Sequence, residues 1–478
     1  MDKCEEAQEF SRITKIDFKD FPSSPQHFSE TWKILGSLRD VVEELQVVEK
    51  ESKFISSLAL IQAIGELINI SQNVKIIPNR LHRRSIVKIT KIWIRALEPI
   101  AQKIGNISIT QPIHNPYVIG DPVEGSLFVG REDIIRDLEQ LWVMSQHLQS
   151  VVLYGHRRMG KTSILRNITN RSGAEIKVVY INLQSLGSVS EGMGEVLMAI
   201  SDGISDGLGV PPPEDEALLR LPQRTFERYL KKVVREMNYK GLIIALDEFE
   251  MIEELIEARQ IPPNFMGVLV AWVQMYSKVA FVLAGLHKLD EMTEDYFQPF
   301  FSKVHTIRIG FLKPASTYQI LANPNDNFLL NYTGEALHLI HNLTAGQPYL
   351  VQLVGFLLVR RYNEQVFEIG RSRDSTFTIE DVEAVINDPE FFSRGRYYFT
   401  GVWNQAKEPP GQHKILEVLA VKTEGLTLNI LRQKADLEPK KFDEALETLK
   451  RHDVVCETEN RCKIIVELFR RWVVENHF

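Results

Sequence analysis

A nine-residue stretch, GHRRMGKTS at residues 155–163, constrains the fold of this chain more than any other feature. It matches the pattern G-x-x-x-x-G-K-[ST], which is typical of a loop that holds phosphate groups between a strand and a helix. Glycines in such a loop let successive backbone N–H groups converge on one anion, and the following helix adds its positive end. The context agrees, because the apolar residues 150–154 predict a strand before the loop and TSILRNI opens a helix after it.

The same pattern predicts roles for individual residues. We expect Lys161 to reach the β- and γ-phosphates of a nucleotide, and the Thr162 hydroxyl to ligate Mg²⁺. The other loop residues expected at the nucleotide are Gly155, Arg158, Met159, Gly160 and Ser163. The roles of Arg157 and Arg158 stay open, because each can contact a phosphate or a neighbouring subunit, or pair with an acid of the resting protein.

A second stretch, GLIIALDEFE at residues 241–250, favours the same interpretation. It predicts a buried strand that ends at Asp247 and Glu248. In a phosphate-loop fold the first acid orients Mg²⁺, usually through water, and the second can polarise an attacking water molecule. A solvated acidic strand end is the alternative. The phosphate loop upstream favours catalysis, so we expect Lys161, Asp247 and Glu248 to act together as a Mg²⁺-ATP site.

Strands and helices alternate from about residue 127 to residue 310, which predicts an α/β domain whose parallel sheet is covered on both faces. The predicted strands are residues 150–154, 177–182, 242–246, 279–284 and 304–309.

The segments on either side are helical in their periodicity. The last one predicts three helices followed by a two-stranded hairpin, which suggests a winged helix. We therefore expect a multidomain chain with four parts. They are an α-helical N-terminal region and linker at 1–112, a P-loop ATPase core at 113–312, a helical lid at 313–405 and a winged helix at 406–478.

Composition sets broad limits. A chain of 478 residues with 44% hydrophobic and 25% charged residues suggests about two to four globular domains. The net charge of −7 gives no global attraction to nucleic acid. Three sparse cysteines argue against a disulfide framework or a zinc site. No stretch reaches ~18 apolar residues and the N-terminus is acidic, so we expect a cytoplasmic protein without a membrane partner.

Five motifs, taken in order, resemble those of the STAND-type (signal-transduction) ATPases, in the branch that shares its architecture with AAA+ archaeal and origin-recognition-like ATPases. The motifs are FVGREDIIRDLEQLW, GHRRMGKTSIL, IIALDEFE, FVLAGLHKL and LTAGQPYLVQLV. The resemblance covers about residues 115–478. It implies that Val129, Gly130 and Arg131 cup the adenine and ribose, and that Pro348 of a lid motif packs near the base.

Two features of the family pattern are weak here. His287 is the nearest polar residue to the place where AAA+ ATPases often carry a small polar sensor, and a structural histidine is the alternative. The lid shows no obvious second sensor arginine, which fits the STAND pattern better than a processive AAA+ motor. An arginine finger from another subunit is not located.

Charge patterning bears on the choice of partner. Residues 411–478 hold 12 Lys/Arg and 12 Asp/Glu, whereas duplex binding usually requires a basic face. A packing or regulatory role for the predicted winged helix is therefore favoured over DNA binding. A basic helix near the N-terminus is a second surface for nucleic acid or an acidic partner, although a charge stripe is more often a solvated face. Its basic residues are Arg80, Arg83, Arg84, Lys88, Lys91 and Arg95.

These observations predict a slowly hydrolysing Mg²⁺-ATPase that acts as a nucleotide-dependent conformational or assembly switch in signalling or defence. The expected ligands are ATP or ADP and Mg²⁺, and the expected partners are further copies of the chain and an unknown trigger or effector protein. A DNA-associated AAA+ ATPase of the origin-recognition or transposition-regulator kind is the alternative. A scaffold that binds nucleotide without hydrolysing it is disfavoured by the intact Lys161, Thr162, Asp247 and Glu248.

Overall fold

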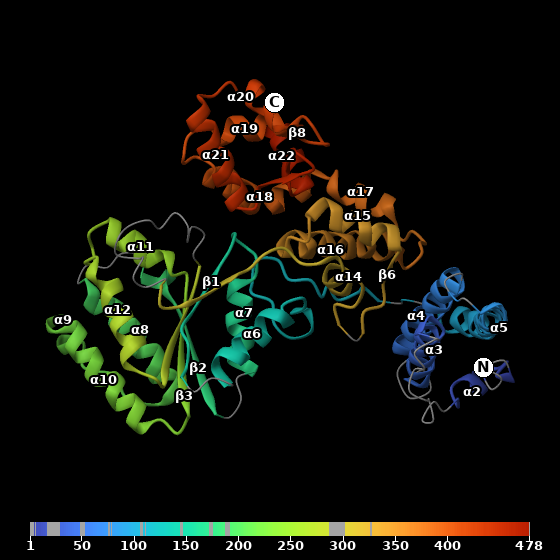
Figure 1. Cartoon of the computed structure of the whole chain (residues 1–478), viewed down its shortest axis with the longest axis horizontal. Helices are drawn as coiled ribbons and strands as arrows, with labels where there is room; N and C mark the ends of the chain where they lie inside the picture. Colours follow the sequence, from blue (N-terminus) through green and yellow to red (C-terminus); the bar gives the residue numbers. More distant parts are fainter. Residues whose placement is uncertain are drawn as a thin grey trace. The chain divides into compact units, whose positions relative to one another are not determined.

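The computed structural model describes residues 6–16, 29–47, 53–74, 79–105, 111–143, 147–171, 175–186, 192–285, 302–325 and 327–477, together with residues 4, 77 and 109. The chain divides into two compact units. Unit 1 is Met1–His114 with Asn325–Leu329, and unit 2 is Asn115–Pro324 with Leu330–Phe478 (Figure 1). None of the described helices combines the length and the apolar character needed to cross a membrane.

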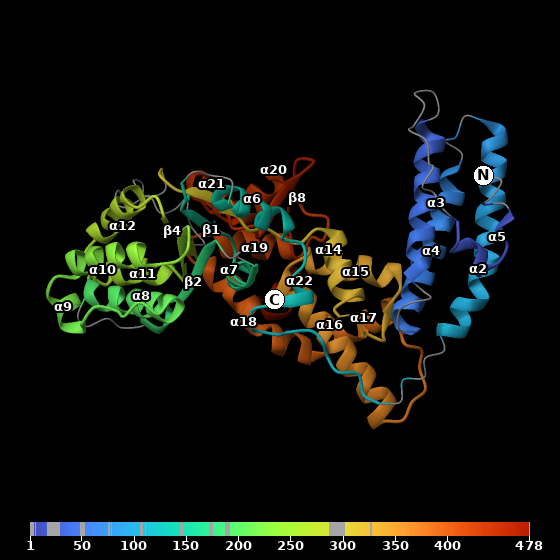
Figure 2. The same cartoon turned by 90° about the horizontal axis from the view of Figure 1, so that it is seen from below.

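Unit 1 is helical. Its helices are α2 Phe10–Ile13, α3 Ser29–Val47, α4 Lys53–Asn73 and α5 Arg80–Gly105. Helix α4 packs against both α3 and α5, and Figure 2 shows the three long helices side by side. Apolar residues three and four apart meet in its core, among them the fully buried Leu38, Leu67 and Trp93. The indole N–H of Trp93 donates to the carbonyl oxygen of Cys4 at 3.0 Å.

Unit 2 is built on a parallel five-stranded sheet with the order β2-β3-β4-β1-β5. The strands are β1 Val151–Tyr154, β2 Ile176–Asn182, β3 Gly241–Asp247, β4 Val279–Ala284 and β5 His305–Arg308. Val151 lies opposite Val282 of β4 on one side and His305 of β5 on the other. The predicted parallel α/β sheet is confirmed.

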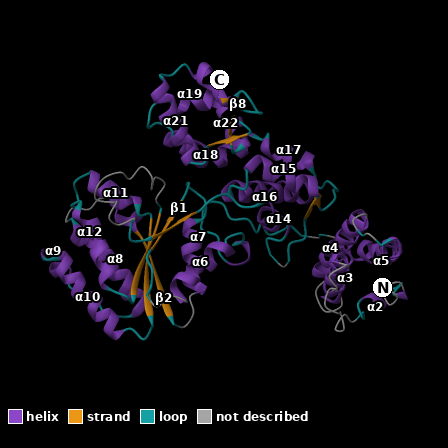
Figure 3. Ribbon diagram, viewed as in Figure 1, coloured by secondary structure: helices purple, strands orange, loops and turns teal. Residues whose placement is uncertain are grey.

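Helices cover both faces of this sheet (Figure 3). Alternate strand residues reach opposite cores, since Val151 and Leu153 face one layer and Val152 the other. The first layer is α6 Glu132–Val143 and α7 Lys161–Arg171. The second layer is α8 Met193–Leu208, α9 Asp215–Arg220, α10 Pro222–Glu236, α11 Glu250–Glu257 and α12 Asn264–Met275. Because both faces are covered, β3 and β4 are buried throughout, which explains their continuous apolar runs.

A helical part follows the sheet. Its helices are α14 Pro314–Ala322, α15 Gly334–Thr344, α16 Pro348–Asn363, α17 Ile379–Ile386 and α18 Pro389–Gln405. A short parallel pair joins β6 Asn331–Tyr332 to β7 Thr376–Phe377. Helix α16 contains the longest apolar run of the sequence and is its buried centre. We refer to α14–α18 as the lid.

The C-terminal module combines helices with a small antiparallel sheet. Its elements are α19 Gln412–Ala420, β8 Leu426–Thr427, α20 Leu428–Ala435, α21 Pro439–Arg451, β9 Val455–Thr458, β10 Arg461–Ile464 and α22 Glu467–His477. Strand β10 pairs with β9 to form the expected hairpin, which is confirmed, and it also pairs with β8, a third strand that was not predicted. Helix α22 was not predicted either. Strand β8 has only two residues, too few to show alternation, and α22 follows β10 after a two-residue connection.

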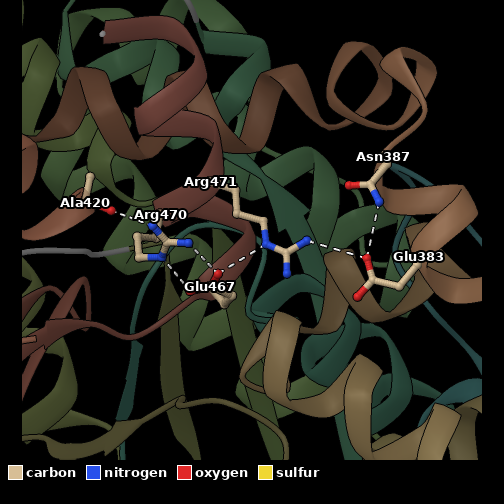
Figure 4. Close-up of polar contacts among 6 residues, drawn as sticks. All are labelled: Glu383, Asn387, Ala420, Glu467, Arg470 and Arg471. Carbon is tan, nitrogen blue, oxygen red and sulfur yellow. Dashed lines mark hydrogen bonds and ion pairs between the residues drawn. The ribbon is translucent and has the colours of Figure 1, made fainter. Parts of the chain in front are cut away.

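The lid and the C-terminal module are tied together by a polar network (Figure 4). Glu467 of α22 accepts hydrogen bonds from Arg470 at 2.7 Å and from Arg471 at 3.2 Å. Arg471 reaches across to Glu383 of α17 at 3.9 Å. The rings of Phe399 in α18 and Trp472 in α22 stack with centroids 6.0 Å apart. Polar and apolar contacts therefore join these two parts of unit 2.

Candidate nucleotide-binding site

The predicted phosphate loop joins β1 to α7, and Lys161 is the first residue of that helix. The loop borders a cavity of about 560 Å³. The walls of this cavity come from the loop, the strand ends, the lid and the segment that precedes α6. Its volume is in the usual range for a small-molecule or cofactor site.

Lys161 is buried and folded back onto its own loop. Its Nζ donates to the carbonyl oxygens of Gly155 at 2.8 Å and His156 at 3.0 Å. Burial lowers the pKa of this ammonium group to about 8, while the negative charges of Glu250, Glu248 and Asp247 act to raise it. Two neutral carbonyls are weaker acceptors than a phosphate, so the lysine has partners that an incoming anion can replace.

The two predicted acids lie where β3 ends. Asp247 is buried, and its carboxylate accepts hydrogen bonds from the Tyr180 hydroxyl at 2.9 Å and from the Glu248 N–H at 3.1 Å. Glu248 has a φ of 55°, in the left-handed region, and the next N–H, of Phe249, donates to the carbonyl of Ala284 in β4 at 2.8 Å. This sharp turn lets both acids line the cavity beside Thr162.

Tyr180 was not predicted as a site residue. It lies on β2 opposite Ala245 of β3, and its hydroxyl reaches the end of that strand. Burial raises the pKa of this phenol, and the charge of Asp247 raises it further, so the group remains a hydrogen-bond donor. The sequence feature that could have identified Tyr180 as a site residue is a tyrosine within a largely apolar predicted strand.

A third acid, Glu250, also lines the cavity and was not predicted. Burial raises its pKa to about 8, and the charge of Glu248 adds to this effect. Its Oε2 packs against Gly285 at the end of β4, where a Cβ would lie only 1.9 Å from that oxygen and φ is +121°. Only glycine fits at this position. His287, the expected sensor position, lies outside the described residues.

Arg131 braces the phosphate loop. It is buried, and its guanidinium donates to the carbonyl oxygens of Met159 at 2.9 Å and Gly310 at 2.8 Å. Burial lowers its pKa to about 10. Arg131 and Val129 both line the cavity, but the arginine head is engaged with backbone carbonyls.

The lid contacts the phosphate loop through its GQP motif. Gln347 is fully buried, and its side chain donates to the carbonyl oxygen of Arg158 at 3.1 Å and accepts from the Leu350 N–H at 2.8 Å. The Arg158 guanidinium lies 4.1 Å from the ring centroid of Tyr349 in α16. Arg158 therefore points at the lid and forms a cation–π contact there. Pro348 lines the cavity.

Gly346 permits this junction. Its φ is +73°, and a Cβ there would lie 2.1 Å from the carbonyl oxygen of Leu312. The Leu312 N–H donates to the Gly346 carbonyl at 2.9 Å, so the lid motif is directly hydrogen-bonded to the segment that follows β5. Sequence reasoning identified the motif but not this role of its glycine, which depends on a contact 34 positions away along the chain.

The segment at residues 118–123 packs on α7. The Val123 N–H donates to the Ser163 hydroxyl at 2.9 Å, and Asn167 donates to the Val123 carbonyl at 2.9 Å. The Val118 N–H donates to Gln352 of the lid at 3.2 Å. Ser163, expected at the nucleotide, thus uses its hydroxyl to hold this segment at the cavity wall.

The cavity brings most of the predicted residues together. Those that line it are Val129, Arg131, Arg158, Met159, Gly160, Lys161, Thr162, Ser163, Asp247, Glu248 and Pro348. Gly130 and Gly155 adjoin it in sequence. This set of groups fits a phosphorylated ligand with Mg²⁺. The buried lysine is suited to phosphate, and the threonine hydroxyl and the two carboxylates supply the oxygen ligands that Mg²⁺ prefers.

Comparison with known proteins agrees with this chemistry. Residues 128–353 match the model of a family described as an ATPase domain predominantly from Archaea. The fold is similar to that of the Walker-type ATPase paby2304 of Pyrococcus abyssi, with a TM-score of 0.54 and 15% identity over 74% of this chain and 98% of that chain. No curated protein matches the chain.

Two further solved structures are similar at lower TM-scores. The Aeropyrum pernix ORC1 protein in complex with DNA has a TM-score of 0.38 and 14% identity, over 74% of this chain and 94% of that chain. The Thermotoga maritima RuvB Holliday junction branch migration motor has a TM-score of 0.37 and 14% identity, over 72% and 95%. The family match and the fold shared with the Pyrococcus protein agree with the phosphate loop and parallel sheet described above, and they support ATPase activity on a P-loop domain.

Proposed function

We propose that this ATPase is a slowly hydrolysing, STAND-like switch in signalling or defence, in which the bound nucleotide sets the position of the lid and the C-terminal module. The observation that carries this proposal is the contact between the phosphate loop and the lid. Gln347 holds the carbonyl of Arg158, and Tyr349 holds its guanidinium. A change in the loop on phosphate binding therefore acts directly on α16.

The lid and the C-terminal module both lie close to the same loop. The buried His156 ring packs near Tyr398 of α18, with centroids 6.2 Å apart. Burial lowers the pKa of His156 to about 4, and the charge of His452 contributes to that shift. Arg308 of β5 forms an ion pair with Asp453 at 2.6 Å. We infer that this neutral module is a winged helix that packs on the ATPase domain.

The lid and the module are expected to move as one body, because Glu383 and Phe399 tie them together through α22. Two packed bodies joined by a bonded hinge supply the bistable element that a switch requires. The hinge is the segment between β5 and α14, where the Leu312 N–H donates a hydrogen bond to the Gly346 carbonyl. Lid movement would change the surface available to further copies of the chain.

The proposed roles follow the geometry. Lys161 binds the β- and γ-phosphates, Thr162 and Asp247 hold Mg²⁺, and Glu248 orients the attacking water. Bound Mg²⁺ would supply charge neutralisation at those phosphates. Among the described residues that line the cavity, those of the lid include no lysine or arginine, so the lid offers no cation to the developing charge. Slow turnover follows from this.

The test is light scattering coupled to size exclusion, with small-angle X-ray scattering, on the wild type and Lys161→Ala. We expect Mg²⁺-ATP to change the mass or radius of the wild type relative to Mg²⁺-ADP, and to leave Lys161→Ala unchanged. Glu248→Gln should keep ATP binding and lower phosphate release by about 100-fold or more. A wild type with identical scattering in ATP, ADP and no nucleotide would refute the switch, and unaltered release in Glu248→Gln would refute the role of that acid.

A further inference from the structure

Unit 1 separates its charges along the sequence. Residues 1–74 hold thirteen Asp/Glu and eight Lys/Arg, whereas residues 75–114 hold eight Lys/Arg and one acid. In the folded unit the basic part is α5, whereas Asp40, Glu43 and Glu44 lie on α3 and Glu66 lies on α4. Helix α4 packs against both α3 and α5. Figure 2 shows α5 beside the other two long helices.

The basic residues of α5 form one exposed stripe. Arg80, Arg84, Lys88, Lys91 and Arg95 are spaced four, four, three and four residues apart, so they share one face over about 22 Å. All five are exposed, whereas the opposite face is buried in the core. Within the described part of the chain, Arg80, Arg84, Lys91 and Arg95 form no ion pair.

An acidic patch lies towards the end of α3. Asp40 and Glu43 are 61% and 66% exposed and share a single cation, Arg39, at 3.1 and 3.6 Å. Glu44 lies beside them and interacts with the negative charge of Glu66 in α4. Burial raises the pKa of Glu44, and the charges of Glu66 and Asp40 raise it further. Among the described residues, Arg39 thus pairs with two of these four carboxylates.

The charges in two terminal turns oppose the helix dipoles, namely Arg80 at the start of α5 and Glu44 in the last turn of α3. Helix α5 begins with arginines and has no acid in its first turn, and α3 has no base in its last turn. Cations at an N-terminus and anions at a C-terminus each cost about 0.3–1 kcal/mol. Their placement therefore weakens the isolated unit, and complementary charge from outside would remove that cost.

We propose that unit 1 is a self-association element, in which the basic stripe of α5 in one copy docks on the acidic patch of α3 and α4 in a second copy. Successive helices run antiparallel across short connections, so the patch and the start of the stripe lie at opposite ends of the unit. Such a contact joins two different surfaces, so it builds a ring or a filament wherever a two-fold axis does not reciprocate it. The proposal goes beyond the nucleotide switch and does not require it.

The test uses charge reversal in the full chain. Sedimentation analysis follows association at low salt and at about 1 M salt, where the Debye length is about 3 Å. The stripe variant is Arg84→Glu with Lys91→Glu, and the patch variant is Asp40→Lys with Glu43→Lys. We expect the wild type to associate at low salt only, and each variant alone to associate about tenfold more weakly or worse. A one-to-one mixture of the two should regain wild-type affinity within about threefold, because each supplies the charge that the other lost.

Two controls sharpen the result. Arg235→Glu with Lys440→Glu makes the same charge change on exposed residues of unit 2 and should leave association unchanged. Lys161→Ala should still associate, so a failure of the nucleotide switch is distinguishable from a failure here. Arg84→Gln with Lys91→Gln should give intermediate weakening, and circular dichroism reports whether each variant keeps its helices.

Three outcomes would overturn the proposal. They are a wild type that stays monomeric at low salt, a stripe variant that associates like the wild type, and a mixture that fails to recover. Binding of a labelled DNA duplex is measured alongside. Loss of duplex binding in the stripe variant, with no loss of association, would assign the stripe to nucleic acid instead.

Discussion

The side-chain amide of Gln347 donates a hydrogen bond to the backbone carbonyl of Arg158 at 3.1 Å. Gln347 is fully buried and precedes the first turn of α16, whereas Arg158 lies between the two glycines of the phosphate loop with a φ of 59°. A left-handed backbone is costly for a residue with a side chain, so the surrounding contacts must maintain it. The lid supplies two of them, to the carbonyl and to the guanidinium.

The first prediction concerns this coupling. Arg158→Ala removes the cation–π contact with Tyr349, which is worth about 0.5–2 kcal/mol. We expect ATP affinity to change by less than about fivefold, while the scattering difference between the ATP and ADP states shrinks by half or more. Arg157→Ala is the matched control, because it removes the same charge from the same loop. Equal loss of the scattering difference in both variants would contradict a specific role for Arg158.

The sequence predicted the sheet well and the site in part. Apolar runs that end at a glycine or an acid define β1 and β3, because such strands are buried on both faces whatever surrounds them. The phosphate loop and Asp247 could also be predicted, because residues that are neighbours in the sequence define each of them. Tyr180 and Glu250 were not predicted as site residues, and Gln347 was recognised only as part of a motif. Their roles depend on contacts between elements that are far apart in the chain.

The second prediction tests the hinge at Gly346. Gly346→Ala places a Cβ 2.1 Å from the Leu312 carbonyl oxygen in a left-handed backbone, which we expect to cost about 3 kcal/mol. Gly370→Ala is the matched control, because Gly370 has a φ of +75° and no atom within 4 Å of the added carbon. It should cost about 1 kcal/mol. Thermal unfolding compares the two, and equal Tm values would show that the Leu312 contact is not limiting.

The third prediction concerns pH. Burial raises the pKa of Glu250 from 4.5 to about 8, so the folded protein holds this proton more tightly than the unfolded chain does. The contribution of Glu250 to the free energy of unfolding is therefore fully present below pH 4.5 and is lost as the pH rises towards 8. Glu250→Gln cannot ionise, so without nucleotide it should be more stable than the wild type above pH 8, by at least about 1 kcal/mol. Glu254→Gln, at an exposed position of α11, is the control. Parallel Tm–pH curves for wild type and Glu250→Gln would refute the shift.

The last prediction separates support of the metal site from support of the fold. Tyr180→Phe deletes the hydroxyl that donates to Asp247 at 2.9 Å, and Tyr229→Phe deletes a buried hydroxyl that donates to the carbonyls of Ser201 and Val210. Each should cost about 1 kcal/mol of stability, because one hydroxyl donor is lost in each case. Only Tyr180→Phe leaves Asp247 less firmly oriented, so only this variant should raise the Mg²⁺ concentration that half-activates ATP hydrolysis, by about threefold to tenfold. The measurement is phosphate release against Mg²⁺ at saturating ATP. The contrary outcome is a Tyr180→Phe variant whose half-activating Mg²⁺ concentration stays at the wild-type value while its Tm falls as in Tyr229→Phe. The hydroxyl would then only support packing, and Asp247 would not depend on it to bind the metal.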